Sequence, residues 1–130
     1  MPLPLVELGA PVLGEPEKAA LAEVIDSGWL TMGERVRRFE REFAALHGVE
    51  DAVAVGSATA ALLLSLAAHD VGPGDEVLVP SMSFVATANV VRHVGATPVF
   101  VDLEAADRPH MSLADAQARL TGRTRAVIVM

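Results

Sequence analysis

The sequence contains no cysteine and only one lysine, and each scarcity limits the chemistry that this chain can perform. Without cysteine there is no disulfide framework, no thiolate nucleophile and no cysteine-ligated zinc site. Lys18 is the only lysine, and the other basic residues are arginines. Any reaction that needs a lysine amine must therefore use Lys18 or take the amine from another chain.

Positive charge and long apolar runs are also scarce. The formal net charge is −7, whereas a nucleic-acid-binding protein usually gathers Lys and Arg on one face. The longest apolar stretch, residues 60–68, is interrupted by Ser65 and is too short to span a bilayer. The first residues lack the basic flank and apolar run of a secretory signal. We therefore expect a cytoplasmic protein with no nucleic-acid or membrane partner.

The histidines do not suggest a metal site. None of His47, His69, His93 and His110 has a metal-ligand spacing to another histidine or to a carboxylate, and the first three fall near the ends of expected helices. We predict no metal ligand and no catalytic histidine in this sequence.

What the sequence has in quantity is apolar residues in regular patterns. Of its 130 residues, 52% are hydrophobic, which is enough for a globular core. An irregular arm containing Pro2, Pro4 and Pro11 precedes two helices expected over residues 15–27 and 34–47. Gly28 and Gly48 are suited to end these helices. Residues 1–50 are therefore expected to form an N-terminal arm with two helices.

After residue 50, short apolar strands alternate with helices. Strands are expected over residues 52–55, 76–79, 97–101 and 125–130, and helices over residues 59–69, 83–94 and 112–120. Ser112 is expected to be the N-cap of the last helix. This alternation is typical of an α/β domain with a mainly parallel sheet flanked by helices. No helix follows the last strand to cover it. Residues 51–130 are therefore expected to be the first part of a larger α/β domain.

Ligands of such sheets bind at the carboxyl ends of the strands, and two segments there could bind one. At residues 56–60, small side chains and the hydroxyls of Ser57 and Thr59 open a helix, an arrangement that suits a phosphate or a plain N-cap. Phe84 is expected in the first turn of the next helix, where its ring could stack on a flat ligand or pack in the core. Asp102 and Glu104 are interpreted as turn-forming, solvated charges.

Five motifs occur in the order and spacing of one enzyme family. The sequence resembles the DegT/DnrJ/StrS-type sugar aminotransferases, which depend on pyridoxal 5′-phosphate (PLP) and have the fold type I architecture. The motifs that carry this resemblance are Gly28-Trp-Leu-Thr-Met-Gly33, Gly56-Ser-Ala-Thr-Ala-Ala-Leu62, Gly72-Pro-Gly-Asp-Glu-Val77, Pro80-Ser-Met-Ser-Phe-Val-Ala-Thr-Ala-Asn89 and Gly95-Ala-Thr-Pro-Val-Phe-Val-Asp102.

The resemblance implies roles for particular residues. Ser57, Ala58, Thr59 and Ala60 are expected to bind the PLP phosphate, although the family usually has glycine where Ala58 stands. Phe84 is expected to stack on the pyridine ring, and Trp29 and Thr31 are expected near the substrate.

The resemblance also implies what residues 1–130 do not contain. In relatives, the aspartate that pairs with the pyridinium nitrogen and the Schiff-base lysine both come after the position of residue 130. Lys18 matches no catalytic position, so we expect no catalytic residue in this chain and no activity from it alone. In relatives, strands from later sequence separate the first strand, here residues 52–55, from the next three. This strand must then lack its neighbours or receive them from a separate C-terminal polypeptide.

For the complete enzyme, the resemblance implies a homodimer that transfers an amino group from an amino acid such as glutamate to a keto sugar carried on a nucleotide. Two alternatives remain open. One is a PLP- or PMP-dependent sugar dehydratase of the same family, in which histidine replaces the lysine beyond residue 130. The other is a non-catalytic remnant or assembly subunit.

Overall fold

The computed structural model describes residues 9–130. The predicted irregular arm lies partly outside this range, since Pro2 and Pro4 are not described, while Pro11 falls in a stretch without helix or strand. The chain divides into two compact units, Met1–Ala54 and Val55–Met130. Each unit is considered by itself below.

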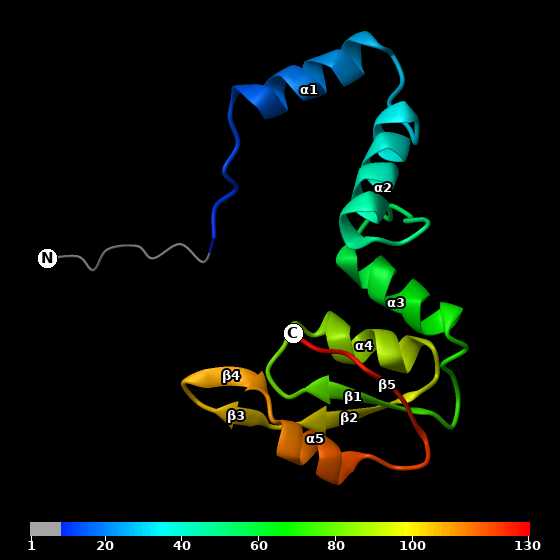
Figure 1. The fold of residues 1–130 in the computed structure, drawn as a ribbon, viewed down its shortest axis with the longest axis vertical. Helices are drawn as coiled ribbons and strands as arrows, with labels where there is room; N and C mark the ends of the chain where they lie inside the picture. The colour runs from blue at the N-terminus through cyan, green and yellow to red at the C-terminus, as the bar shows by residue number, and fades with distance from the viewer. Residues whose placement is uncertain (1–8) are drawn as a thin grey trace, which may run out of the picture. The chain divides into compact units, whose positions relative to one another are not determined.

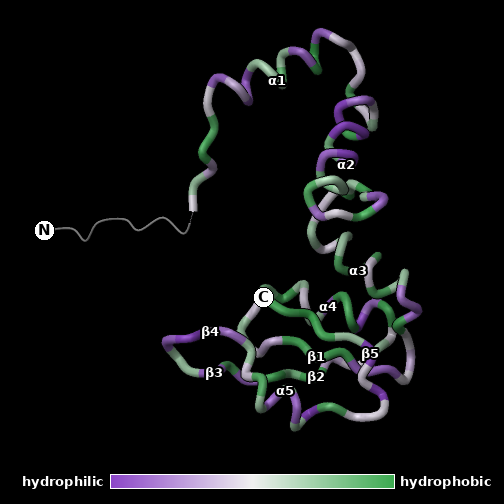
Figure 2. The backbone as a smooth tube through the Cα atoms, in the orientation of Figure 1, coloured by the Kyte–Doolittle hydropathy of each residue, from purple (hydrophilic) through white to green (hydrophobic). Residues whose placement is uncertain are grey.

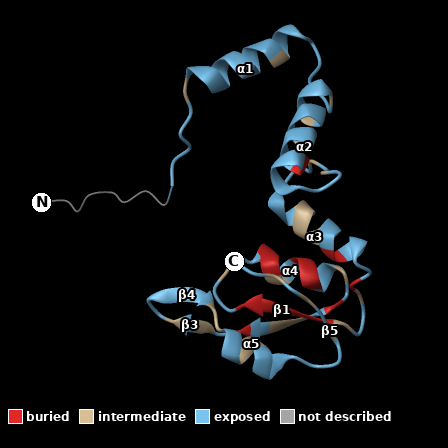
Figure 3. Ribbon diagram, viewed as in Figure 1, coloured by how far each residue is buried: buried red, intermediate tan, exposed pale blue. Residues whose placement is uncertain are grey.

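The described part of the first unit contains the two helices that the sequence predicts, α1 (Glu15–Asp26) and α2 (Glu34–His47). At the start of α1, the Glu17 carboxylate accepts a hydrogen bond of 2.6 Å from the Gly14 amide. Gly28 and Gly48 follow the two helices with φ of 68° and 65°, a left-handed conformation that glycine adopts without strain. No residue of α1 is buried, and only Ala44 of α2 is buried (Figure 3).

The strand expected over residues 52–55 is absent, which corrects that prediction. These residues form neither strand nor helix, and Val53 is 77% exposed. The Ala54 amide donates a 2.8 Å hydrogen bond to the Glu40 carboxylate of α2. A strand is stable only when its N–H and C=O groups pair with a neighbour, and no described strand pairs with this segment. The composition of the run suits a strand, but without a partner it cannot form one.

The second unit is built around a three-stranded parallel sheet (Figure 1). Its strand order is β2-β1-β5, and β1 (Glu76–Pro80) pairs in parallel with both β2 (Thr97–Val101) and β5 (Thr124–Val127). The helices of this unit are α3 (Ala58–Ala68), α4 (Ala86–His93) and α5 (Leu113–Arg119). The predicted α/β class with a parallel sheet and flanking helices is confirmed, and the sheet is a partial one.

The core of this unit lies between β1 and the helices α3 and α4. Val77 and Val79 point to the same face of β1 and pack with Leu66 of α3 and with Val90 and Val91 of α4. All five residues of β1 are buried, as expected for the central strand of a parallel sheet. Figure 3 shows that the buried residues are concentrated in β1 and α4.

Several boundaries differ from the sequence prediction. A short antiparallel hairpin of β3 (Leu103–Ala105) and β4 (Arg108–Met111) follows β2 and was not predicted. Glu104 lies in β3, not in a turn, and its carboxylate forms a 2.6 Å ion pair with Arg108 across the hairpin. The last strand ends at Val127 although residues 125–130 were expected, and α4 begins at Ala86 although Ser83 was expected.

Along residues 9–130, no helix is both long enough and apolar enough to cross a membrane. Figure 2 shows hydrophobic residues along most of α3 and in the middle of β1.

Candidate functional site

The carboxyl edge of the sheet brings together the starts of two helices. Because β1 and β2 are parallel, both end at the same edge, and α4 follows β1 directly. The helix α3 packs against α4 and leads through a short loop into the start of β1, so α3 itself begins toward the edge where β1 ends (Figure 1). The two segments predicted to bind a ligand therefore lie at the same end of the second unit.

The start of α3 offers hydrogen-bond donors for an anion. Ser57 is the N-cap, and its hydroxyl accepts a 3.1 Å hydrogen bond from the Ala60 amide. Within the described chain, neither the amides of Ala58 and Thr59 nor the Thr59 hydroxyl donates to any acceptor. Unpaired amides at a helix N-terminus carry partial positive charge and bind anions.

The space around this helix start is also suitable. The side chains of Ala58 and Ala60 are small, and a Cβ placed on Gly56 would meet no atom within 4 Å. This set of amide and hydroxyl donors fits the oxygens of a phosphate group, and the small side chains leave room for it. The N-cap interpretation is equally satisfied, since Ser57 caps α3 with one hydroxyl and leaves the other donors free.

Phe84 lies on the surface next to this edge. Its side chain is 77% exposed, so it is not a residue of the core. The residue is also not in the first turn of a helix, because α4 begins two residues later, at Ala86. The Thr87 amide donates a 3.0 Å hydrogen bond to the Phe84 carbonyl, which closes a turn over residues 84–87 at the start of α4. The ring is thus available to a flat ligand.

Trp29 and Thr31 belong to the other unit. They lie in the loop between α1 and α2 and line a cavity of about 720 Å³. The Trp29 indole Nε1 donates a 3.0 Å hydrogen bond to the Met32 carbonyl and lies directly against Gly33. The structure therefore brings Ser57 to Ala60 and Phe84 to one edge of one unit, and places Trp29 and Thr31 in a cavity of the other.

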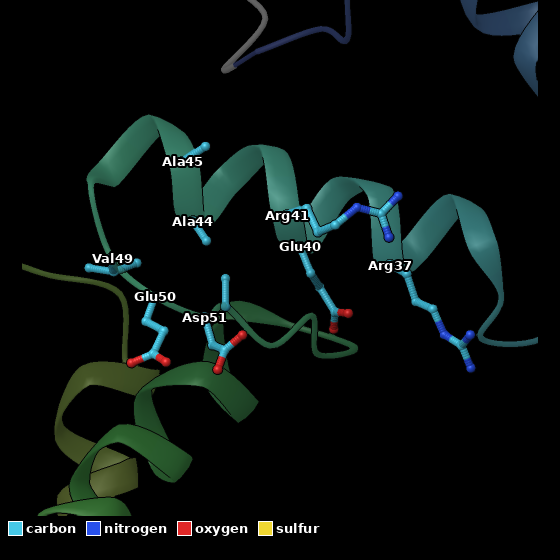
Figure 4. Close-up of a pocket in the computed structure, with 9 residues that line it drawn as sticks. Arg37, Glu40, Arg41, Ala44, Ala45, Val49, Glu50 and Asp51 are labelled. Atoms are coloured by element: carbon cyan, nitrogen blue, oxygen red, sulfur yellow. The ribbon is translucent and has the colours of Figure 1, made fainter.

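A second cavity of the first unit is lined mainly by charged residues of both signs. It has a volume of about 420 Å³ and includes Arg37, Glu40 and Arg41 of α2 together with Glu50 and Asp51 (Figure 4). The Glu40 carboxylate is already bound by the Ala54 amide. Among residues 9–130 there is no cluster of three His, Asp or Glu residues that could hold a metal ion.

Lys18 is the only lysine of the chain. It belongs to α1 in the first unit, and its side chain is 72% exposed. Its Nζ forms a 2.7 Å ion pair with Glu15 one turn earlier in the helix. These are the properties of a solvated surface lysine.

Sequence reasoning missed a group that fixes the end of β2. The Asp115 carboxylate of α5 accepts a 2.8 Å hydrogen bond from the Asp102 amide and a 2.6 Å one from Arg119 Nε. Arg119, followed by the Asp102 amide, holds the pKa of Asp115 below its ordinary value. The signal was present, because Ser112 caps α5 as predicted and Asp115 and Arg119 are four residues apart.

A buried carboxylate at the opposite end of β1 was also missed. Glu76 accepts hydrogen bonds from the Thr121 hydroxyl, at 2.5 Å, and from Arg123. The Thr121 bond, followed by the Arg123 bonds, lowers the pKa of Glu76. This group joins the start of β1 to the segment before β5, far along the strand from the carboxyl edge, so its role is structural.

Comparison with known proteins gives one consistent result. The model of the DegT/DnrJ/EryC1/StrS aminotransferase family matches residues 11–130. The chain is 45% identical over 118 residues to the spore coat polysaccharide biosynthesis protein SpsC of Bacillus subtilis, covering 91% of this chain and 30% of that protein. It is 43% identical over 128 residues to a dTDP-4-dehydro-2,3,6-trideoxy-D-glucose 4-aminotransferase of Saccharopolyspora spinosa, covering 97% of this chain and 33% of that protein.

Solved structures agree with the sequence relatives. The aminotransferase TlmJ from Streptoalloteichus hindustanus superposes with a TM-score of 0.85 at 42% identity, covering 95% of this chain and 34% of that one. Spr1654 from Streptococcus pneumoniae is named as a sugar aminotransferase and was solved in a PMP form. It gives a TM-score of 0.85 at 36% identity, covering 95% of this chain and 31% of that one. A PLP form of Spr1654 matches with a TM-score of 0.84 at 36% identity, covering 94% and 31%. This chain thus spans about 30% of the length of the curated relative SpsC.

Proposed function

The chain belongs to the DegT/DnrJ/EryC1/StrS aminotransferase family, and from this membership we propose that it supplies the phosphate-binding and ring-stacking part of a PLP site. In this proposal Ser57, Ala58, Thr59 and Ala60 hold the phosphate of the cofactor, and Phe84 covers one face of its pyridine ring. The cofactor supplies the electron sink for the reaction, while the protein supplies binding and orientation.

The observation that carries the proposal is the exposed ring of Phe84 at the carboxyl edge. The Phe84 ring is 77% exposed and so makes little apolar contact within the protein. A flat ligand that stacks on the ring would supply such contact. The free amides of Ala58 and Thr59 lie at the same end of the unit and suit the phosphate of the same ligand. Two complementary features at one edge support a phosphorylated aromatic cofactor better than either feature does alone.

For the whole protein, we propose transfer of an amino group from an amino acid, with glutamate as the expected donor, to a keto sugar carried on a nucleotide. The S. spinosa relative is named for a reaction of this class, on a dTDP-linked dehydro sugar. Trp29 and Thr31 would contact the substrate. The complete enzyme would act as a cytoplasmic homodimer, and a separate polypeptide could supply the remainder of the large domain.

We propose further that this chain alone does not catalyse the reaction. Catalysis by this route needs a lysine amine at the cofactor. Lys18 is 72% exposed on α1 and forms an ion pair with Glu15, and it matches no catalytic position of the family.

The test is to titrate the chain with PLP, reduce with borohydride and map the product by peptide mass spectrometry. We expect saturable binding and no turnover of glutamate with a nucleotide-linked keto sugar. A reduced adduct on Lys18 together with turnover would contradict the assigned role of Lys18. Absence of any saturable binding of PLP would contradict the cofactor site.

The coding sequence downstream of Met130 separates the remaining possibilities. A reading frame that encodes the missing aspartate and lysine supports the aminotransferase, and histidine in place of the lysine supports a dehydratase. Absence of both residues, within this gene and beside it, supports a non-catalytic role.

A further inference from the structure

The loop that carries Phe84 is held by two hydrogen bonds that converge on one residue. The Thr87 amide donates to the Phe84 carbonyl at 3.0 Å. The Thr87 hydroxyl lies 2.7 Å from the Ser83 hydroxyl, and the two share a hydrogen bond. Phe84 therefore lies between two residues, Ser83 and Thr87, whose side chains are bonded to each other across it.

The residues on both sides of Phe84 are anchored to the rest of the unit. Thr87 is 8% exposed and is anchored in α4, next to the core residues Val90 and Val91. On the other side of Phe84, the Ser81 amide donates a 2.8 Å hydrogen bond to the Val101 carbonyl and extends the β1–β2 pairing. The ring of Phe84 itself is exposed and makes no aromatic contact in the described chain. Its direction is therefore set by the loop backbone and not by packing around the ring.

We propose that Ser83 and Thr87 form a positioning pair that fixes the backbone of Phe84 so that its ring faces the cofactor. This inference rests on the proposed function, because the pair has a positioning role only if the Phe84 ring stacks on the cofactor. Neither residue touches the cofactor in this account. Their hydroxyl–hydroxyl bond restricts the loop before binding, so less conformational freedom is lost when a ring stacks on Phe84.

The experiment compares two ligands on the 130-residue chain. Pyridoxamine 5′-phosphate carries both the phosphate and the ring and cannot form an imine with Lys18, whereas inorganic phosphate carries only the anion. Both dissociation constants are measured by calorimetry or ³¹P NMR. The dissociation constant of inorganic phosphate divided by that of pyridoxamine 5′-phosphate isolates the contribution of the ring to binding. Phe84→Ala should lower this ratio by about threefold to tenfold, the usual value of an aromatic stacking contact.

Ser83→Ala and Thr87→Val should each weaken pyridoxamine 5′-phosphate binding while leaving phosphate binding unchanged. The loss should not exceed that of Phe84→Ala. Thr87→Ser keeps the hydroxyl and should restore the ratio. In a Phe84→Ala background, Ser83→Ala should have no further effect on either ligand, because the residue that it positions is gone.

Thr121→Val is the matched control. It removes a threonine hydroxyl from the same unit, at the Glu76 end of β1, away from the carboxyl edge. It should lower the thermal unfolding midpoint without changing the ratio. Circular dichroism of each variant checks that the fold is retained, and Thr87→Ser keeps the test valid if Thr87→Val fails to fold.

Two results overturn the positioning role. One is a normal ratio in Ser83→Ala, with Phe84→Ala showing the expected loss. The other is equal weakening of both ligands in Ser83→Ala and Thr87→Val, which indicates a merely structural role. A normal ratio in Phe84→Ala itself is a different failure, because it removes the ring contact on which the proposed function depends.

Discussion

At the scale of single residues, Thr59 carries the most direct test of the phosphate site. Among residues 9–130, neither its hydroxyl nor its amide donates a hydrogen bond, whereas the Ser57 hydroxyl is already used to cap α3. Thr59→Val keeps the shape of the side chain and removes one donor. Because a hydrogen bond to an anion contributes about 1.5–3 kcal/mol, the affinity for inorganic phosphate should fall about tenfold or more.

Ser65→Ala is the control for this measurement. Ser65 lies later in α3, more than one turn from the helix start, and loss of its hydroxyl should leave phosphate binding unchanged. If Thr59→Val binds phosphate as tightly as the unaltered chain does, Thr59 is not a phosphate ligand.

Gly33 offers a second test at this scale, on the predicted substrate residue Trp29. Gly33 precedes α2 with an extended backbone that any residue adopts, but a Cβ at this position would overlap the Trp29 indole. In Gly33→Ala the indole must move, and its 3.0 Å hydrogen bond to the Met32 carbonyl should break. The cost in stability should be small, since the indole is free to rotate into solvent.

Trp29 is the only tryptophan, so intrinsic fluorescence reports this movement directly. We expect a red-shifted emission and faster quenching by acrylamide in Gly33→Ala. Gly9→Ala serves as the control, because a Cβ there would meet no atom within 4 Å. An unchanged spectrum in Gly33→Ala would mean that the indole does not lie against Gly33 in solution.

At the scale of secondary structure elements, Glu76 links β1 to the segment before β5. Its carboxylate is bonded to Thr121 and Arg123, which hold its folded pKa below the ordinary value of 4.5. A carboxyl group with a lowered folded pKa contributes stability that is full above its unfolded pKa. That contribution is lost as the pH falls through the folded value.

Glu76→Gln removes the charge and should make the chain less stable at neutral pH. On acidification below about pH 4.5, the unaltered chain should lose stability faster than the variant, and the two unfolding curves should converge. Urea unfolding followed by circular dichroism, at neutral pH and at several values below 4.5, measures the difference. Because Glu34 and Asp115 titrate in both proteins, the difference between the curves isolates Glu76. If the difference in stability between the two proteins does not depend on pH, the folded pKa of Glu76 is not lowered.

The elements also show what local sequence can predict. Ser112 was predicted to cap α5, and its hydroxyl accepts the Asp115 amide at 3.3 Å, because capping depends only on neighbouring residues. The strand over residues 52–55 was predicted from the same kind of local pattern and is wrong, because a strand also needs a partner. The hairpin of β3 and β4 was missed because its two strands are short and partly charged, and they lack the alternation of apolar and polar residues that marks a strand.

In the candidate site too, features set by neighbouring residues could be predicted and features that depend on the folded structure could not. The loop before α3 and the capping role of Ser57 could be predicted from small and hydroxyl residues between a strand-like run and a helix. The position of Phe84 could not, since the helix boundary at Ala86 and the exposure of the ring are not visible in the local pattern. The bond between Ser83 and Thr87 was also hidden, because serine and threonine four residues apart give no signal by themselves.

At the scale of the whole molecule, the most informative feature is apolar surface in the second unit. The helix α3 is apolar on nearly all sides, yet only Leu66 in it is buried. Between α3 and residues 125–129 lies a cavity of about 340 Å³, lined largely by apolar side chains that include Leu62, Val127 and Val129. Apolar surface of this kind marks a site where another polypeptide segment or ligand binds, and it also favours aggregation.

The expected result is that this cavity binds an apolar dye in the native state. Val129 lines it and is 74% exposed, so Val129→Lys should place a charge in the cavity at a cost in stability of less than about 0.5 kcal/mol. Fluorescence of bound anilinonaphthalene sulfonate should fall in this variant. Val12→Lys makes the same exchange at an exposed position of the first unit and should leave the fluorescence unchanged. Weak dye binding by the unaltered chain, with cooperative unfolding as a monomer, would show instead that the cavity is closed in solution.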